Sequence, residues 1–226
     1  MGIFDDIRTL FRSKSKNSVN NVDLKPDFNG PLKLRYGSFV EFDNLVFNLI
    51  EDKTLFGHSP QNQKISAVGK VDLGQGVKLQ RYYFDDDETW LQVNTQGNDG
   101  DDGVEEIILW KYYKTDTPTS NKEVERLIGC DSGLGLPSLK VENHVYDRVW
   151  GTDLGYAQFV SFNEDVHIDK DNIVDYTVSH RCMLYRREIE DSSRMEFYLV
   201  SAEENDGISI VHSVGISINR EDIKNF

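Results

Sequence analysis

The chain has 226 residues, and its 25 Lys and Arg against 39 Asp and Glu give a formal net charge of −14. Hydrophobic residues make up 38% of the sequence, which is enough for a folded core and excludes wholesale disorder. The acidic balance argues against nucleic acid as a partner, because the protein would repel a polyanion. No apolar run approaches the roughly 18 residues of a membrane-spanning helix, which excludes an integral membrane protein of that type.

The cysteines and the first residues bear on the cellular compartment. Cys130 and Cys182 are too few for a disulfide framework or a structural zinc site. Residues 1–16 lack the continuous apolar region and the cleavage pattern of a secretory signal. The start does not match a myristoylation motif, because Asp6 stands where Ser or Thr is expected. We therefore expect a cytoplasmic protein.

Residues 1–12 are predicted to form an amphipathic helix. Its apolar side chains share one stripe at helical spacing: Ile3, Phe4, Ile7, Leu10 and Phe11. So short a helix is marginal in water, so we expect this stripe to be covered by the protein's own body, by a partner helix or by an anionic membrane surface. Membrane contact would be weak and peripheral at the inner membrane, because the acidic body opposes approach. Residues 13–30 read as a polar linker.

Residues 31–226 are predicted to form a single mainly β domain. Segments rich in β-branched and aromatic residues recur between Gly, Asp and Asn: 32–42, 64–73, 77–84, 89–95, 106–113, 145–150, 157–162, 173–188, 196–202 and 208–218. Several connections are too short for parallel crossovers. We predict a mainly β (α+β) fold with antiparallel sheets, sandwich- or barrel-like, and a few short helices. The similar outlines of 80–95 and 182–202 leave two related halves open.

Two short helices are predicted within the body. Ser120 and Glu123 have the spacing of a capping box, and Gly129 would end that helix. A last short helix is expected to begin near Asn219, with Asp222 in its first turn.

The sequence carries none of the common catalytic or metal-binding motifs. The sequence has no nucleophile elbow, zincin motif, phosphate-binding loop or dinucleotide-binding motif. The acidic stretch 85–106 lacks the ligand spacing of a calcium loop. Asp165, His167 and Asp169 would share one face of a strand, but half-buried strands show the same alternation. We predict no catalytic residue, no metal site and no cofactor.

His180 and Cys182 would also share a strand face. Side chains two residues apart on a strand lie some 6–7 Å from each other, too far for a direct hydrogen bond, so we interpret Cys182 as a buried core residue. The Arg-rich run 181–187, together with Arg194, could grip an anionic ligand. Pairing with Asp or Glu across strands is the more ordinary interpretation in so acidic a chain.

Four segments carry a resemblance to a known family. Residues 69–86, 146–150, 180–187 and 198–204 resemble the YjfK-like family of bacterial proteins with a domain of unknown function, in matching order from about residue 31 to about residue 218. The family-like motif residues, of unknown role, are Arg81, Tyr82, Asp85, Arg148, Trp150, His180, Tyr185, Arg186 and Arg187. The resemblance implies a cytoplasmic bacterial protein without an assigned activity. It also implies genes nearby for a phage-shock-protein-A-like protein, small membrane proteins and a glutathionylspermidine-synthase-like enzyme.

Two hypotheses from different classes follow. In the first, the chain is a non-enzymatic accessory protein of a membrane-stress module that acts through protein contacts, for instance with the phage-shock-protein-A-like protein. In the second, it is an enzyme or a small-molecule-binding domain for a cationic ligand such as a polyamine. Acidic and aromatic side chains that converge on a concave site would favour the second hypothesis. A body without such a cavity would favour the first.

Overall fold

The computed structural model describes residues 30–98, 100–151, 154–169 and 173–226. The predicted helix 1–12, with Ile3, Phe4, Ile7, Leu10 and Phe11, lies outside these residues, and so does the linker up to residue 29. The described part is mainly β, which confirms the predicted fold class. No helix within it is long and apolar enough to cross a membrane.

The strands and helices follow one another along the chain with short connections. The strands are β1 (Phe39–Phe42), β2 (Gln63–Gly74), β3 (Val77–Phe84), β4 (Thr89–Gln96), β5 (Val104–Asp116), β6 (Ser138–Val141), β7 (His144–Arg148), β8 (Val160–His167), β9 (Tyr176–Glu188), β10 (Met195–Glu204), β11 (Ile208–Ile218) and β12 (Ile223–Asn225). The α-helices are α2 (Asn44–Asn48) and α3 (Asn121–Ile128). Short 3-10 turns lie at Pro31–Lys33, Glu51–Lys53, Asp101–Gly103, Cys130–Ser132 and Arg220–Asp222.

Eight of the strands close into a barrel. The order is β2-β3-β4-β5-β11-β10-β9-β8, and β8 returns to β2. Every pairing in this ring is antiparallel. Closure removes the free sheet edges that an open sheet would expose. The ring consists of two four-stranded meanders, β2–β5 and β8–β11, which meet first strand to first strand and last strand to last strand. This arrangement agrees with the similar outlines of 80–95 and 182–202.

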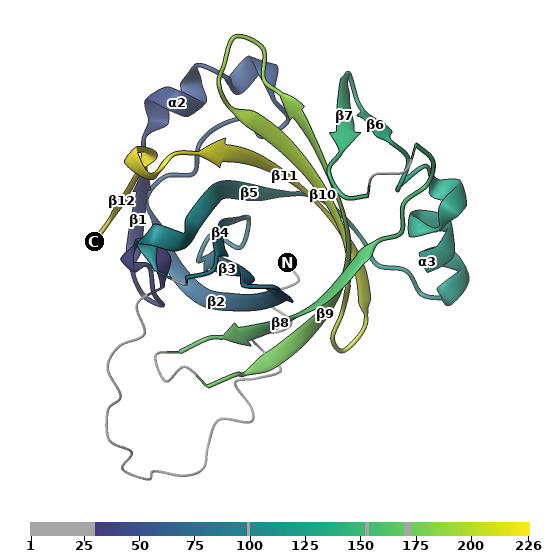
Figure 1. Cartoon of the computed structure of the whole chain (residues 1–226), viewed down its shortest axis with the longest axis horizontal. Coiled ribbons are helices and arrows are strands. Elements are labelled where there is room, and N and C mark those ends of the chain that lie inside the picture. The colour runs from purple at the N-terminus through teal and green to yellow at the C-terminus, as the bar shows by residue number, and fades with distance from the viewer. Residues whose placement is uncertain (1–29, 99, 152–153, 170–172) are drawn as a thin grey trace.

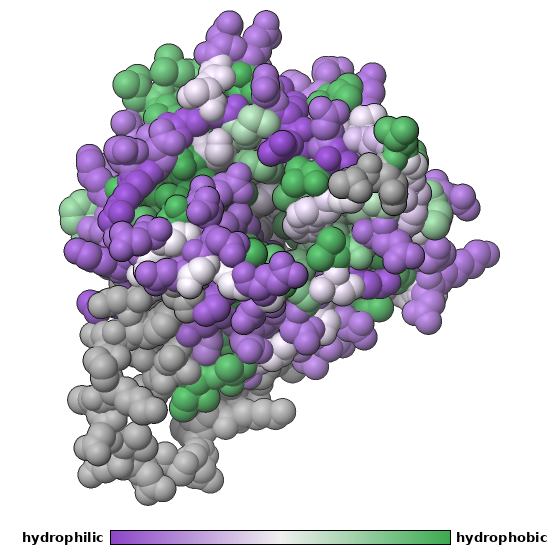
Figure 2. Space-filling model, viewed as in Figure 1, coloured by the Kyte–Doolittle hydropathy of each residue, from purple (hydrophilic) through white to green (hydrophobic). Residues whose placement is uncertain are grey.

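The two faces of the ring carry different cores, because successive side chains on a strand point to opposite sides. The inner face, which we call the lumen, carries an aromatic core that includes Trp90, Trp110 and Phe197. The outer face carries a larger apolar core. Residues 32–56 cover it on the side of β1 and α2, and α3 with β6 and β7 lies on the opposite side (Figure 1). On the face that Figure 2 shows, the exposed surface is largely polar, with separate apolar patches.

The predicted local signals are confirmed at the helices. Ser120 accepts a hydrogen bond from the backbone N–H of Glu123, and α3 ends at Gly129. The predicted last helix is a single 3-10 turn that Asn219 and Asp222 cap reciprocally.

The predicted strand 32–42 is wrong in its first half. Pro31 begins a 3-10 turn, and Leu32 adopts a φ of 62°. The backbone N–H of Leu32 donates to Asp101 at 2.6 Å, so a long-range side chain replaces the ladder hydrogen bond that a strand would need. The strand begins only at Phe39.

Candidate functional site

Charged and polar side chains meet inside the barrel. The lumen cluster consists of Tyr83, Arg81, Glu164, His180 and Ser201, which come from β3, β8, β9 and β10. Arg81 is 4% exposed, Glu164 1% and His180 3%. Since buried charges are costly unless they are paired, this is the place in the barrel where function or specificity is most expected.

Arg81 sits in a cage of carboxylate and aromatic groups. Its Nη1 donates to Glu164 Oε2 at 2.6 Å, and its Nε donates to Gln92 Oε1 at 3.2 Å. Its guanidinium carbon lies 4.9 Å from the ring centre of Trp90 and 5.5 Å from that of Phe162. Burial alone lowers the pKa of Arg81, but the attraction of Glu164 outweighs it and raises the pKa. The side chain is therefore a permanent cation that is held from three sides.

Glu164 is the acceptor at the centre of the cluster. Besides the bond from Arg81, its Oε1 accepts from the Tyr83 hydroxyl at 2.7 Å, and its Oε2 lies 2.9 Å from His180 Nε2 in an ion pair. Burial alone raises the pKa of Glu164, but Arg81 and His180 together lower it to about 2. The carboxylate is ionised at any physiological pH.

Gly69 on β2 makes room for this carboxylate. A Cβ at position 69 would lie 1.6 Å from Glu164 Oε1. The close approach of the β2 backbone to Glu164 therefore requires glycine, and the reason is space rather than an unusual backbone angle.

Ser201, His180 and Glu164 are arranged in line like a hydrolytic triad. His180 Nδ1 lies 3.0 Å from Ser201 Oγ, and the Cys182 thiol donates to the same oxygen at 3.2 Å. Ser201 thus contacts both His180 and Cys182. Cys182 is fully buried, as predicted.

The charge state of His180 decides what this arrangement can do. Burial alone lowers the pKa of His180, but Cys182 and Glu164 raise it to about 9. An imidazolium at neutral pH has no free lone pair, so it cannot accept the Ser201 proton as a general base must. The ring also stacks on Phe162, with centroids 5.2 Å apart, so that one of its faces is covered as well. The three side chains lie in the order of a triad, but His180 is protonated and forms an ion pair with Glu164.

A second buried carboxylate ties a loop to the outer face. Glu196 is fully buried and accepts from Arg187 Nε at 2.7 Å, from the Tyr146 hydroxyl at 2.8 Å and from the backbone N–H of Leu55 at 2.6 Å. Arg187 and Glu196 lie directly opposite each other on β9 and β10. The predicted cross-strand pairing is confirmed for Arg187, whereas Arg194 lies outside the strands and pairs with Asp222 of the last 3-10 turn at 2.7 Å.

A third group of contacts holds the segment after α3. The backbone N–H of Gly135 donates to the Tyr185 hydroxyl at 2.6 Å. Arg148 donates to the carbonyl oxygens of Gly135 and Gly155. The first contact fastens Gly135 to β9, and Arg148 of β7 holds Gly135 and Gly155 together, which is a structural task.

The nine family-like motif residues therefore do not form one site. Arg81 and His180 meet in the lumen cluster. Arg187 belongs to the contacts around Glu196. Arg148 and Tyr185 belong to the contacts around Gly135. Trp150 packs against the lumen core, and Arg186 lies opposite Phe197 near the end of β9. The Tyr82 hydroxyl donates to Gln80 on the outer face, and Asp85 accepts from the backbone N–H of Lys64.

The three potential metal ligands at and after β8 make separate contacts and do not face a common point. Asp165 accepts from the Thr177 hydroxyl, and His167 Nδ1 lies 2.9 Å from the carbonyl oxygen of Ile173. Asp169 follows after the strand has ended. Within the described ranges no group of three or more His, Cys, Asp or Glu side chains is placed to hold a metal ion.

The two carboxylates that organise these clusters were not among the residues predicted from the sequence. Glu164 lies on the same strand face as the apolar Phe162 and Val166, and Glu196 shares a face with the buried Tyr198 and Val200. A single charged residue within an apolar alternation is the signal that could have found both, because such a position must be paired when it is buried.

Fold and cluster together define a closed antiparallel barrel protein with an ionic network in its lumen. The model of a family described as "Protein of unknown function (DUF2491)" matches residues 9–224, and the chain belongs to that family. It is 28% identical over 185 residues to "Uncharacterized protein YjfK" of Escherichia coli (strain K12), across 81% of this chain and 82% of that protein. No solved structure matches the chain significantly.

Proposed function

We propose that this protein is a non-enzymatic accessory protein of a membrane-stress module that acts through protein contacts at the cytoplasmic side of the inner membrane. Its proposed partner is the phage-shock-protein-A-like protein whose gene neighbourhood the family resemblance implies. The proposed contact is the apolar stripe of residues 1–12, which a partner helix could cover at no cost in net charge.

The lumen cluster is the observation that supports this proposal. Its chemistry-bearing side chains are engaged with one another: Arg81 and His180 with Glu164, and Ser201 with His180 and Cys182. An active site needs a base that is free to take a proton and a donor aimed at a substrate. Here the base is already protonated, and the donors already have acceptors.

In the alternative function, a cationic ligand would have to compete with Arg81 for the carboxylate and aromatic groups of the lumen. Carboxylate and aromatic groups do converge in the lumen, as recognition of a polyamine would require. The cation that they hold is Arg81, between Trp90, Phe162 and Glu164. A polyamine would have to displace a buried guanidinium that is covalently part of the barrel, so the geometry favours the accessory role.

The test uses the full chain and the purified phage-shock-protein-A-like protein of the same organism. We expect a stoichiometric complex in size-exclusion chromatography with light scattering at micromolar concentrations. Ile7→Asp combined with Leu10→Asp should abolish it, whereas the matched variant Arg8→Ala with Thr9→Ala, on the opposite helix face, should not. The absence of a complex, or a complex that survives Ile7→Asp with Leu10→Asp, contradicts the proposal.

Two further measurements distinguish the proposed protein contact from a cationic-ligand function and from a membrane contact. Calorimetry with spermidine should show no saturable site, and a stoichiometric site would favour the cationic-ligand function instead. Flotation with anionic vesicles should recover little protein, because a short helix with few basic residues binds weakly. Strong flotation without partner binding would replace the proposed protein contact with a membrane contact.

A further inference from the structure

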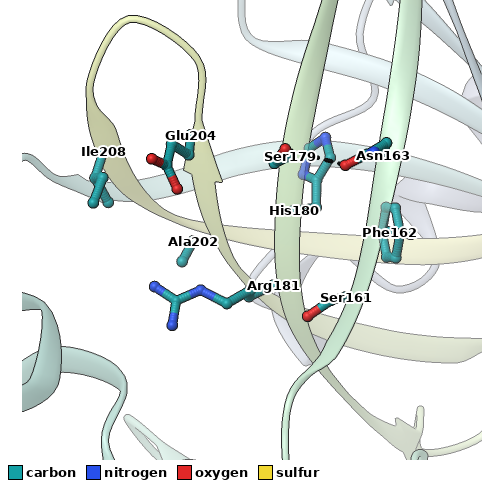
Figure 3. Close-up of a pocket in the computed structure, with 9 residues that line it drawn as sticks. All are labelled: Ser161, Phe162, Asn163, Ser179, His180, Arg181, Ala202, Glu204 and Ile208. Atoms are coloured by element: carbon teal, nitrogen blue, oxygen red, sulfur yellow. Dashed lines mark hydrogen bonds between the residues drawn. The ribbon is translucent and has the colours of Figure 1, made fainter.

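A groove lies on the outer face of the barrel, behind the lumen cluster. It has a volume of about 280 Å³ and crosses β8, β9 and β10. Nine residues line it (Figure 3). Six of them alternate onto the outer face of the three strands: Ser161, Asn163, Ser179, Arg181, Ala202 and Glu204. The other three are Phe162, His180 and Ile208. The volume is at the lower end of small-molecule sites, which suits a small solute rather than a polymer.

Two opposite charges stand at the two ends of this groove. Arg181 lies opposite Ala202, and Glu204 lies two residues further along β10, opposite Ser179. Such diagonal neighbours on one sheet face are about 7–8 Å apart at their Cα atoms. Figure 3 shows Ala202 between the two charged side chains.

Neither charge has a partner in the part of the chain that the structure describes. Both side chains are exposed, and no ion pair joins them. Four arginines do form an ion pair with a carboxylate: Arg81 and Arg187 on barrel strands, and Arg194 and Arg220 outside them. Arg181 differs from them although a carboxylate is its diagonal neighbour.

The space between the two charges offers small and polar contacts. Ala202 is buried and contributes an apolar floor without bulk. The Ser179 hydroxyl donates to Asn163 Oδ1 at 3.1 Å, and Asn163 and Ser161 are both exposed. The groove therefore combines a cation, an anion, short polar groups and an apolar floor.

We propose that this groove binds a small zwitterionic α-amino acid with a polar side chain. The α-carboxylate pairs with the Arg181 guanidinium, which presents two parallel N–H donors, and the α-ammonium pairs with Glu204. In the ligand the two charges are joined by one carbon, so it can bridge two protein charges that form no ion pair with each other in the described structure. A polycation is disfavoured by Arg181, and a polyanion by Glu204.

This site is independent of the proposed protein contact. It lies on strands of the barrel, whereas the partner contact was assigned to residues 1–12. Loss of one would leave the other unchanged.

The experiment is a nuclear magnetic resonance titration of the full chain with L-serine at low salt. We expect saturable shifts of the backbone amides of Ser161, Ser179 and Ala202, with a Kd on the order of 1 mM or below. Acetate and methylammonium, which each carry one of the two charges, should bind at least about tenfold more weakly. Shifts that fail to saturate by about 50 mM overturn the proposal.

Variants locate the two contacts. Arg181→Gln and Glu204→Gln should each weaken L-serine binding at least about tenfold, since each removes a charge-assisted contact. Arg126→Gln on the exposed face of α3 is the matched control and should leave binding unchanged. If Arg181→Gln or Glu204→Gln binds L-serine as the unmodified chain does, the two side chains do not hold the ligand and the proposal is wrong.

Discussion

The two halves of the barrel meet at two seams that are built from different interactions. At the first seam, β5 and β11 pair along residues 107–116 and 210–218. Ile108 and Trp110 of β5 pack in the lumen there, and Gly215 of β11 lies directly opposite Trp110. At the second seam, β2 and β8 pair over three residues each, 68–70 and 165–167. Here the lumen side carries Glu164 in place of an apolar core residue.

The difference teaches how the ring stays closed where its backbone ladder is short. The long seam is held by many backbone hydrogen bonds and by apolar burial. At the short seam, Glu164 of β8 is ion-paired to Arg81 of β3 and to His180 of β9, so one carboxylate connects strands on both sides of the junction. We therefore infer that the lumen cluster stabilises the pairing of β2 with β8.

The largest effect should follow from removing the charge of Glu164. Glu164→Gln leaves Arg81 and His180 as buried cations without their counter-ion, which costs about 3–5 kcal/mol of unfolding free energy. Urea unfolding of the full chain measures it. The exposed Glu190→Gln is the matched control and should change stability by less than about 0.5 kcal/mol. A loss below about 1 kcal/mol for Glu164→Gln would show that the cluster does not hold the seam.

The same substitution at the two seams gives the sharpest comparison. An alanine Cβ at Gly69 would lie 1.6 Å from Glu164 Oε1, whereas at Gly215 it would lie 2.7 Å from the Trp110 ring. We expect Gly215→Ala to cost about 1–3 kcal/mol through overpacking. Gly69→Ala should cost more, because it displaces the carboxylate from its cations.

A double variant isolates the cause at Gly69. In a Glu164→Ala background, Gly69→Ala should add almost no further loss, since the carboxylate that it would meet is gone. Additive losses would mean that Gly69 serves another purpose than making room for Glu164.

The pH dependence should distinguish the ionic seam from the rest of the barrel. The folded-state pKa of His180 is raised to about 9 from 6.5, so its stabilising contribution is fully present below about pH 6.5 and is lost as the pH rises through 9. Arg81, Glu164, Glu203 and Cys182 surround the imidazole, and the carboxylates favour its charged form.

His180→Gln provides the reference for this measurement. The stability difference between the unmodified chain and His180→Gln should shrink between about pH 6.5 and 9, followed by urea unfolding at each pH. On the acid side Glu164 acts in the opposite direction: its pKa is lowered to about 2, so its contribution fades as the pH falls from 4.5. The difference also removes the effect of His212, whose pKa burial lowers to about 4 and which destabilises the fold in acid. A difference that stays constant up to pH 9 would contradict a charged His180.

The smallest effect should come from Cys182. Cys182→Ser keeps a small polar group beside Ser201, so we expect a loss of about 1 kcal/mol or less. In the native protein a thiol reagent should modify the exposed Cys130 and leave the buried Cys182 unmodified until the barrel unfolds. Rapid native reaction of both thiols would mean that the lumen opens readily.

Much of the local structure followed from the sequence. The turns at 72–76, 85–88 and 191–193 join antiparallel neighbours, as their composition predicted. The cap at Ser120 and the interpretation of Cys182 as a core residue were also right. These features depend on residues close in the chain or on the alternation of one strand, and such information is local.

The candidate site was only partly accessible in this way. Arg81 and His180 were singled out by family resemblance, yet nothing in their local sequence connects them with each other or with Glu164. Strand pairing brings residues 81 and 164 within hydrogen-bond distance, although 83 positions separate them in the chain. The burial of Glu164 and the need for glycine at position 69 become visible only when β2 and β8 lie side by side.

The sequence alone determined the strand content, the antiparallel hairpins, the acidic charge and the capped helix, because these depend on composition and on short-range periodicity. Tertiary structure decided which meander meets which, that the ring closes at β2 and β8, and that Ser201, His180 and Glu164 meet in a buried ion network. The physical reason is that a buried charge takes its protonation state from neighbours in space. The neighbours of His180 are Glu164 and Cys182, which raise its pKa, and of these only Cys182 is close to it in sequence.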